Sequence, residues 1–467
     1  MLTSGTPDRS SRVGLALAGG GPEGAVYEIG VLRALDEALD GLDLNRLPVY
    51  VGVSAGAFLC ANLINGISAS QNVRAIVKHD PGEHPFHPET FFSPAFWEFL
   101  SRTMMTPALL VESIRDYLRH PEDLTLVESL LRLSRALPVA VFDNEPIREY
   151  LARIYSMPGR TDDFRKLGRK LIVVATELDS GVAVRFGTPG FDHVPISRAV
   201  QASAALPGLY PPVVIDGHHY VDGVLLKTMH ASVALDAGAK LVICVNPIVP
   251  VDMLHGGTSH QRRRRLTELG LPTVLSQAFR TLIHSRMTTG LAAYAPRFPN
   301  RDLVLFEPAP DDYWMFFTNI FSFSSRKKVA EAAYQATRRD LLRRYDELAP
   351  VFARHGIRLR HDVLVDESRD LWVGVGLEGG SRRDRIAGDL PMTKSLHHAL
   401  SSLEQWIDSQ AAPIRIAPVP EVPRPVADRG TRLVSARPGP RARLRRTGAG
   451  RGTAPAARVH KAGRQGR

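Results

Sequence analysis

The segment "LALAGGGPEGAVYEIGVLRAL" (residues 15–35) begins with an apolar run, continues into three glycines and ends in apolar residues at helical spacing. This order predicts a buried strand, a tight turn and a helix. Gly19, Gly21 and Gly24 also match G-x-G-x-x-G, the spacing of a loop that holds the pyrophosphate of a dinucleotide. The segment therefore indicates an α/β fold, and it leaves open which anion the glycine loop holds.

A dinucleotide is the first candidate ligand of this loop. Such a site places an acidic residue at the end of the next strand, where the carboxylate binds a ribose hydroxyl. The next predicted strand, "VYVGVS" (49–54), ends in Ser54 instead. This difference argues against a dinucleotide-binding protein, which remains the third alternative for this chain.

The second strand runs into "GVSAG" (52–56), which matches the G-x-S-x-G pattern of a nucleophile elbow. Small residues beside Ser54 permit a sharp strand-to-helix turn that lifts its hydroxyl to the head of the sheet, at the positive end of a helix. Attack of a serine on an ester creates an oxyanion, which backbone N–H groups of a glycine loop can stabilise. The two motifs together therefore predict a serine nucleophile that faces an oxyanion loop.

A serine nucleophile also needs a base. The chain has 16 histidines, and an α/β-hydrolase would use one of them after an acid, but that fold places its serine after more strands than precede Ser54. Asp222 in "YVDGVLL" (220–226) closes a predicted strand, and Gly223 permits a turn directly after it. A carboxylate that is hydrogen-bonded to the serine can accept its proton without an imidazole. An Asp-Gly pair by itself is more typical of an ordinary turn.

Strands alternate with helical segments along the chain, which predicts a mostly parallel sheet that helices cover on both faces. Residues 90–158 are expected to form a wholly helical insertion over this sheet. Beyond residue 250 we expect helices near 271–293 and 325–355, with a strand at "RDLVLFEP" (301–308) between them. Further strands are predicted at 170–178, 181–188, 212–223 and 240–248.

Two aromatic segments stand out from this pattern. Six of the eleven residues in 313–323 are aromatic, and the insertion carries an aromatic group of its own. Each segment is either packed on the core or exposed to an apolar substrate, and 313–323 could also face a membrane. The aromatic group of the insertion is Phe91, Phe92, Phe96, Trp97 and Phe99.

The formal net charge of +11 is concentrated at one end of the chain. Residues 412–467 contain thirteen Arg and one Lys against two acidic residues, a net charge of +12, so the remaining chain carries −1. This segment is rich in Pro, Gly and Ala without apolar periodicity, which predicts a disordered tail. We expect peripheral contact of the tail with anionic membrane lipids and no specific nucleic-acid partner; a solvated appendage is the alternative.

Other features concern the cellular compartment. No apolar run approaches the length of a membrane-spanning helix, and "MLTSGTPDRSSR" (1–12) lacks the apolar core of a signal peptide, so a cytoplasmic protein is expected. Cys60 and Cys244 both lie in apolar segments. We therefore expect two buried thiols rather than a disulfide.

The three motifs, in this order, resemble those of patatin-like phospholipases, a family of lipid acyl hydrolases with a Ser–Asp catalytic dyad. The segments 141–151, 173–181 and 201–213 are similar to connecting blocks of bacterial members, so that the resemblance covers about residues 12–250. It implies a three-layer α/β/α sandwich with Ser54 as nucleophile and Asp222 as base, and it implies neither a metal nor an organic cofactor. It also implies an oxyanion hole of backbone N–H groups at Gly19, Gly20 and Gly21, supported by the motif glycines Gly24, Gly52, Gly56 and Gly223.

One position departs from the family pattern. Members usually carry Arg or Lys just before the last glycine of the loop, whereas this chain has Pro22-Glu23-Gly24. The Glu23 carboxylate is therefore expected to repel a phosphate-bearing substrate and to favour a neutral ester. The main alternative to a phospholipase or esterase in lipid catabolism or remodelling is a catalytically silent scaffold of the same fold that binds lipid or protein.

The resemblance and the composition together predict four parts of the chain. These are a flexible N-terminus (1–11), a catalytic domain (12–250, with the insertion at about 90–158), a mainly helical C-terminal extension (251–411) and the basic disordered tail (412–467).

Overall fold

The computed structural model describes residues 13–78, 93–94, 140–252, 266–309, 323–373 and 375. All of them lie in one unit, Met1–Asp384. The predictions for residues 1–11, for most of the insertion with its aromatic group, for nearly all of 313–323 and for the tail fall outside these residues. None of the described helices is long and apolar enough to cross a lipid bilayer.

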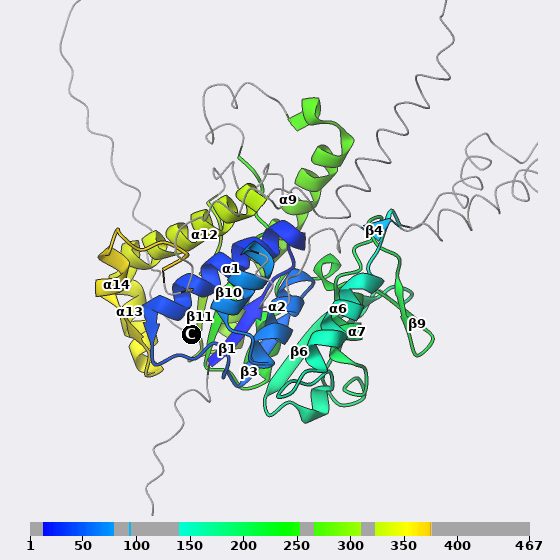
Figure 1. Cartoon of the computed structure of the whole chain (residues 1–467), viewed down its shortest axis with the longest axis horizontal. Helices are drawn as coiled ribbons and strands as arrows, with labels where there is room; N and C mark the ends of the chain where they lie inside the picture. Colours follow the sequence, from blue (N-terminus) through cyan, green and yellow to red (C-terminus); the bar gives the residue numbers. More distant parts are fainter. Residues whose placement is uncertain are drawn as a thin grey trace, which may run out of the picture. The chain divides into compact units, whose positions relative to one another are not determined.

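Within the described residues, eight strands form one sheet in the order β11-β10-β1-β3-β6-β9-β8, with β7 paired to β6 (Figure 1). The pairs β11-β10, β10-β1, β1-β3 and β3-β6 are parallel, whereas β7 and β9 run antiparallel to β6. The mostly parallel sheet is thus confirmed. Its strands are β1 (Val13–Leu17), β3 (Val49–Gly52), β6 (Lys170–Glu177), β7 (Ala183–Phe186), β8 (Val213–Ile215), β9 (His218–Asp222), β10 (Leu241–Val245) and β11 (Asp302–Phe306).

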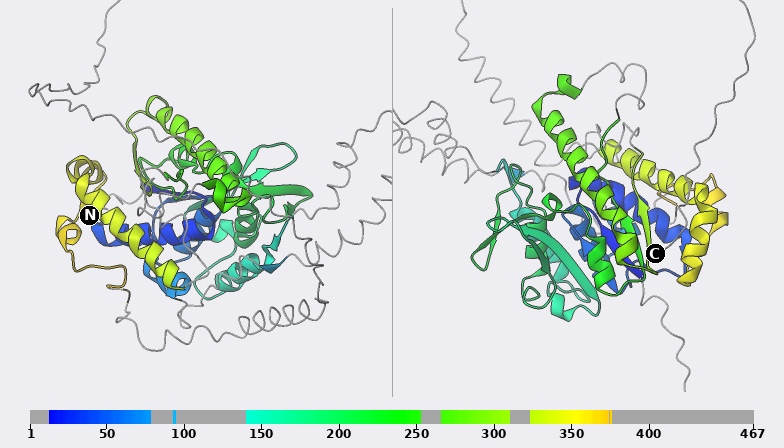
Figure 2. Two further views of the ribbon diagram at one scale, coloured as in Figure 1. Left: turned by 90° about the horizontal axis from the view of Figure 1, so that it is seen from above. Right: turned by 180° about the vertical axis from the view of Figure 1, so that it is seen from behind.

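Helices cover both faces of this sheet (Figure 2). Alternate side chains of a strand point to opposite faces: Leu15 and Leu17 pack in one apolar cluster, and Ala16 and Ala18 in the other. The first cluster includes α1 (Gly21–Ala38), α2 (Ala55–Ile64), α6 (Glu145–Tyr155), α7 (Ile196–Ser203), α12 (Phe323–Arg343), α13 (Tyr345–Arg354) and α14 (His361–Val365). The second includes α8 (Ala231–Asp236), α9 (Leu271–Ala292) and α10 (Tyr294–Arg297). The three-layer α/β/α sandwich is therefore confirmed.

Smaller elements complete the described fold. Helix α3 (Ala69–Asn72) continues into a π-helical turn (Val73–Lys78), and short 3₁₀ turns occur at Phe164–Lys166, Gly223–Leu225 and Leu266–Leu269. Two antiparallel pairs stand apart from the main sheet: β2 (Leu39–Asp40) with β12 (Arg358–Leu359), and β4 (Ser93–Pro94) with β5 (Phe142–Asp143). Cys60 and Cys244 are buried and free, as expected.

Three expectations about individual elements were wrong. The strand predicted over 212–223 is a hairpin of β8 and β9, because Asp216 and Gly217 adopt positive φ (52° and 81°) and turn the chain. The helix predicted near 325–355 breaks between α12 and α13, where Arg344 leaves helical geometry (φ −99°, ψ 21°). The insertion is not wholly helical, since β4 pairs with β5 and the Phe142 N–H donates to the Leu209 carbonyl (2.9 Å).

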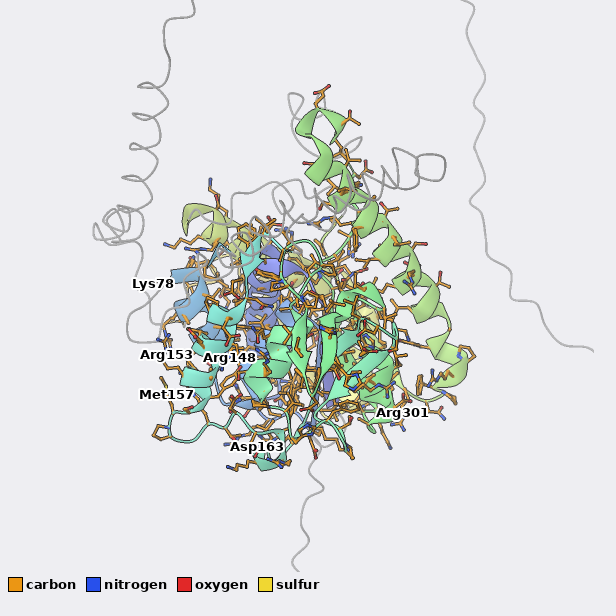
Figure 3. All side chains as sticks on the ribbon, turned by 90° about the vertical axis from the view of Figure 1, so that its right-hand side faces the viewer. Lys78, Arg148, Arg153, Met157, Asp163 and Arg301 are labelled. Atoms are coloured by element: carbon orange, nitrogen blue, oxygen red, sulfur yellow. The ribbon has the colours of Figure 1, made fainter. Side chains whose placement is uncertain are left out.

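Helix α6 shows how the apolar pattern orients an element. Its apolar face buries Ile147, Leu151 and Ile154 against the core. Arg148 and Arg153 lie on its outer side, along one edge of the described fold (Figure 3). This orientation directs Ile147 toward the interior, where it reaches the cavity described below.

The residues beyond 250 pack on the same sheet. Strand β11 extends it beside β10, and α12 lies against α1 (Figure 1). At the α1–α12 crossing, a Cβ on Gly30 would lie 2.3 Å from the Ala330 carbonyl oxygen and 2.8 Å from Ala333 Cβ. Glycine at position 30 therefore sets how closely the two helices approach. The boundary proposed at residue 250 stays a prediction.

We expect Gly30→Ala to lower the free energy of unfolding by about 2 kcal/mol, because overpacking at a backbone contact outweighs the roughly 1 kcal/mol gained in helix propensity. Gly290→Ala in α9 is the matched control, since a Cβ there meets no atom within 4 Å. It should leave stability unchanged or raise it by up to about 1 kcal/mol. Urea denaturation of both variants measures the difference, and equal stabilities would contradict the close-packing argument.

Candidate active site

The parallel pairing of β1 with β3 brings the two glycine-containing motifs together. Leu17 is in register with Gly52, so the carboxyl ends of the two strands lie side by side. The Val53 N–H donates to the Leu17 carbonyl (3.2 Å), and the Gly56 N–H donates to the Ala18 carbonyl (3.1 Å). The turn around Ser54 is thus tied directly to the glycine loop.

Ser54 occupies a strained turn between β3 and α2. Its φ is 52° and its ψ is −121°, a conformation that non-glycine residues rarely adopt. A Cβ on Gly52 would lie 2.4 Å from Ala57 Cα, and a Cβ on Gly56 would lie 2.5 Å from the carbonyl of Leu17. Both glycines are therefore required sterically, which is the geometry that G-x-S-x-G predicts.

A residue that the sequence analysis missed holds this turn in place. The backbone N–H of Ser54 donates to Ser203 Oγ (2.8 Å), and the Ser203 hydroxyl donates to the Val174 carbonyl (2.6 Å). Ser203 is fully buried at the end of α7, and 149 residues separate it from Ser54. A serine within the small apolar run "QASAAL" (201–206) is the one local signal that could have drawn attention to it.

Asp222 and Ser54 come from strands on opposite sides of β6: Ser54 follows β3, and Asp222 ends β9. Gly52 pairs with Val173, and Ala175, two residues further along β6, pairs with Asp222 on the antiparallel strand β9. The carboxylate accepts a hydrogen bond from the Val224 N–H (2.9 Å), and it lines the same cavity as Ser54. Burial raises the pKa of Asp222 to about 7, and the Val224 N–H and the Ser54 hydroxyl oppose this shift.

The glycine loop lies beside this pair at the start of α1. Gly20 caps the helix, and Gly21 begins it with a φ of 61°. The Gly19 N–H already donates to the Thr228 carbonyl (3.2 Å), whereas Gly20 and Gly21 line the cavity at Ser54. The remaining motif glycines permit close packing. A Cβ on Gly24 would lie 2.9 Å from Pro247, and a Cβ on Gly223 would lie 2.3 Å from the Val174 carbonyl oxygen.

Ser54 and Asp222 open into a cavity of about 500 Å³. Its lining is largely apolar and comes from both sides of residue 250, with α9 forming one wall. On α9, Leu275 and Phe279 are about half exposed, so this wall reaches the surface. The apolar lining includes Phe58, Ile147, Val200, Leu206, Leu209, Val224, Ile248, Leu275, Phe279 and Ile283. Such a cavity fits a long apolar group whose polar end lies at Ser54.

Histidine is not a neighbour of Ser54 within the described structure. None of the described residues that line the cavity is a histidine. His193 and His219 contact Asp216 (2.8 Å) and Asp179 (3.3 Å) at the surface. His230 is buried outside the cavity lining, and burial lowers its pKa to about 3. The arrangement therefore offers a carboxylate, not an imidazole, as the proton acceptor of Ser54.

The expectation for Glu23 needs correction. Its carboxylate lies 3.8 Å from Arg280 Nη2 of α9, so it does not present an uncompensated negative charge beside the loop. Burial raises the pKa of Glu23 to about 7, and the charge of Arg280 opposes this shift. Local sequence could not show this pairing, because Arg280 comes from the C-terminal extension.

Metal ligation has no candidate site in the part of the chain that the structure describes. No group of three or more His, Cys, Asp or Glu side chains there could hold a metal ion.

Residues 15–235 match the family model described as patatin-like phospholipase. Among solved structures, VipD from Legionella pneumophila aligns with a TM-score of 0.32 and 16% identity, over 70% of this chain and 66% of that one. The ExoU–SpcU complex from the type III secretion system of Pseudomonas aeruginosa aligns with a TM-score of 0.19 and 20% identity, over 43% and 37%. This chain covers less than two thirds of the length of either solved structure. TM-scores this low support no inference about the function of this chain.

We expect Ser203→Ala to lower the free energy of unfolding by about 1–3 kcal/mol, because it leaves buried backbone groups without their hydroxyl partner. It should also slow the reaction of Ser54 with a fluorophosphonate. Ser197→Ala is the control: its hydroxyl, also buried on α7, bonds Asp162 (2.7 Å), so its loss should cost stability without changing that rate. Equal labelling rates in the two folded variants would contradict a positioning role for Ser203.

Proposed function

Residues 15–235 form a patatin-like phospholipase domain, and from this premise we propose that the chain is a lipid acyl hydrolase with Ser54 as nucleophile and Asp222 as general base. The observation that carries the proposal is the position of the Ser54 hydroxyl beside the buried Asp222 carboxylate, at the polar end of an apolar cavity that both residues line. The cavity is of a size and polarity that suit acyl chains. The substrate is a carboxylic ester of a phospholipid or of a neutral lipid.

The first half of the reaction forms an acyl-enzyme. Asp222 accepts the hydroxyl proton as Ser54 Oγ attacks the ester carbonyl carbon, and the carbonyl oxygen becomes an oxyanion. Backbone N–H groups of Gly20, Gly21 and Ala55 stabilise this charge, together with the N-terminal dipoles of α1 and α2. The N–H of Gly19 is bonded to Thr228 and supports the loop instead. Asp222 then returns the proton to the departing alkoxide, which leaves as the alcohol.

The second half releases the fatty acid. Asp222 takes a proton from a water molecule as the water oxygen attacks the acyl carbonyl carbon. Collapse of this second oxyanion breaks the bond to Ser54 Oγ, which regains its proton from Asp222. A carboxyl pKa near 7 suits both roles, because the group must accept and donate protons close to neutral pH.

The basic tail and the cellular compartment remain predictions. The tail at 412–467 lies outside the described residues, and its proposed contact with anionic membrane lipids rests on its charge alone. A cytoplasmic location likewise rests on the sequence alone.

We expect Ser54→Ala to abolish hydrolysis of a p-nitrophenyl ester, because it removes the attacking oxygen and leaves a turn that alanine can occupy. Asp222→Asn keeps the shape but lacks basicity, so its kcat should fall by about 10²–10⁴-fold. His230→Gln serves as the matched buried control and should cost far less. Melting temperatures of all variants report folding.

Two outcomes would contradict this assignment. Turnover by Ser54→Ala above about one per cent of wild type would exclude Ser54 as nucleophile. Failure of the wild-type protein to react with a fluorophosphonate probe would instead favour the catalytically silent scaffold.

We expect kcat/KM for a neutral ester to fall about tenfold per pH unit below pH 7 and to level above it, because only ionised Asp222 accepts the Ser54 proton. Its pKa is raised, so activity is lost as the pH falls through 7 and not through its usual value near 4. Glu23 also has a pKa of about 7, which makes Glu23→Gln the necessary control. If the acidic limb disappears in Glu23→Gln, Asp222 is not the group that titrates.

A further inference from the structure

Helix α9 carries an exposed apolar face on its N-terminal half, which projects from the described fold (Figure 1). Val274, Leu275, Phe279 and Leu282 have 38–57% of their surface exposed, and Ala278 is exposed as well. Residues 274, 278 and 282 follow one another at intervals of four, as do 275 and 279, so all five lie on one side of the helix. These five residues form the α9 apolar face.

The α9 apolar face is continuous with the catalytic cavity. Leu275 and Phe279 belong to this face, and they also line the cavity at Ser54. From another segment, Leu209 lines the cavity and is 39% exposed, and its carbonyl accepts the N–H of the exposed Val141 (3.2 Å). Exposed apolar residues from two parts of the chain therefore stand at the opening of the cavity.

This concentration of apolar surface is the main one on the described part of the chain. Twelve large apolar residues are exposed there, and six of them are the four on α9, Leu209 and Val141. Removing such surface from water is favourable, and a contiguous exposed apolar patch is typical of a site that another surface covers. The α9 apolar face therefore favours a partner.

Positive charge accompanies the apolar face. Helix α9 contains Arg280 and Arg286 but neither Asp nor Glu. Arg286 is exposed one helical turn beyond Leu282, and both residues line a smaller cavity of about 120 Å³ together with the exposed Lys227. None of the described residues that line this smaller cavity is acidic. The edge of the apolar face is thus cationic, which suits an anionic surface.

The position of the face favours a bilayer over a protein as the partner. A protein seated on the α9 apolar face would cover Leu275 and Phe279, and with them the opening of the cavity. A bilayer instead supplies acyl chains at this opening, so that a lipid can enter along apolar side chains. Leu and Phe on one side of a helix, with Arg or Lys beside them, are typical of helices that lie in a membrane interface.

We propose that the α9 apolar face is the surface by which this protein docks on a bilayer that contains anionic lipids, with the opening of the catalytic cavity against the membrane. The proposal rests on the lipid acyl hydrolase function given above, and it gives the orientation of the protein on the membrane that holds its substrate. It is separate from the contact predicted for the basic tail at 412–467, and it requires no particular headgroup in the cavity.

Binding to vesicles tests the proposal on the full chain, in the Ser54→Ala background so that the lipids stay intact. We expect Val274→Gln/Leu282→Gln to bind vesicles of phosphatidylglycerol and phosphatidylcholine about 5–50-fold more weakly, because two apolar side chains no longer leave water on docking. Neither residue lines the catalytic cavity. With Ser54 present, the double change should therefore leave kcat/KM for soluble p-nitrophenyl butyrate within about twofold of wild type.

Val365→Gln/Val373→Gln is the matched control. These valines are 48% and 42% exposed, comparable to the 57% of Leu282 and the 38% of Val274. They lie near the C-terminal end of α1, whereas the N-terminal end of α1 lines the cavity. The control should bind vesicles as its parent does. Equal losses in the two double variants, or no loss in either, would overturn the proposal.

A fluorescent label reports the contact directly. Cys60 and Cys244 are buried, so a thiol-reactive dye attaches at an introduced, exposed cysteine. We expect the emission of an NBD dye on Leu282→Cys to shift to shorter wavelength when vesicles are added, because the dye enters apolar surroundings, and the same dye on Val365→Cys to show no shift. Vesicle binding without a shift at position 282 would mean that another segment, such as the tail, makes the contact.

The charge at the edge of the face has a separate test. Arg286→Gln should weaken binding to the anionic vesicles by about 2–5-fold and leave binding to pure phosphatidylcholine vesicles unchanged. Equal weakening on both kinds of vesicle would contradict the preference for an anionic bilayer.

Failure of this proposal is distinguishable from failure of the hydrolase mechanism. If Ser54→Ala is inactive while Val274→Gln/Leu282→Gln binds vesicles like its parent, only the docking surface fails. If that double variant instead changes the oligomeric state, a second copy of the chain covers the face, and the proposal is likewise overturned. If Ser54→Ala still hydrolyses p-nitrophenyl butyrate, the mechanism fails, and the dye measurement still decides the docking surface. Melting temperatures confirm folding of all variants.

Discussion

The close contact between Gly56 and the end of β1 is the constraint on which the site depends. A Cβ at position 56 would lie 2.5 Å from the Leu17 carbonyl, so the start of α2 could not approach the glycine loop with any larger residue there. This approach brings the N-termini of α1 and α2 to the same point and forces Ser54 into positive φ. The strain persists because the Ser203 hydroxyl and the Ala18 carbonyl hold the turn from two sides.

The electrostatics of Asp222 follow from the same enclosure. An apolar cavity that suits acyl chains also removes water from the carboxyl group, and this burial raises its pKa to about 7. The Val224 N–H and the Ser54 hydroxyl oppose this shift and stabilise the charged form of the carboxyl group. The apolar lining of the cavity and the raised pKa of Asp222 thus have one physical cause, the exclusion of water.

The segment beyond residue 250 belongs to the architecture of this site. Strand β11 extends the sheet, α12 packs on α1 through the space left by Gly30, and α9 forms one wall of the cavity. Arg280 on that wall lies near the Glu23 carboxylate and compensates its negative charge. Local sequence alone suggested that Glu23 was a repulsive charge beside the oxyanion loop. The charge distribution beside the loop accordingly depends on two segments that are far apart in the chain.

The sequence by itself determined the α/β class, the strand–turn–helix units and the candidates Ser54 and Asp222. These features could be predicted because their physical requirements are local: a sharp turn needs small residues beside the serine, and a buried strand needs an apolar run. Only the tertiary structure decided that Asp222 meets Ser54, that Ser203 holds the turn across 149 residues, and that Glu23 faces Arg280. These contacts depend on strand register and helix packing, and a single sequence carries no local signal for the distance between residues so far apart.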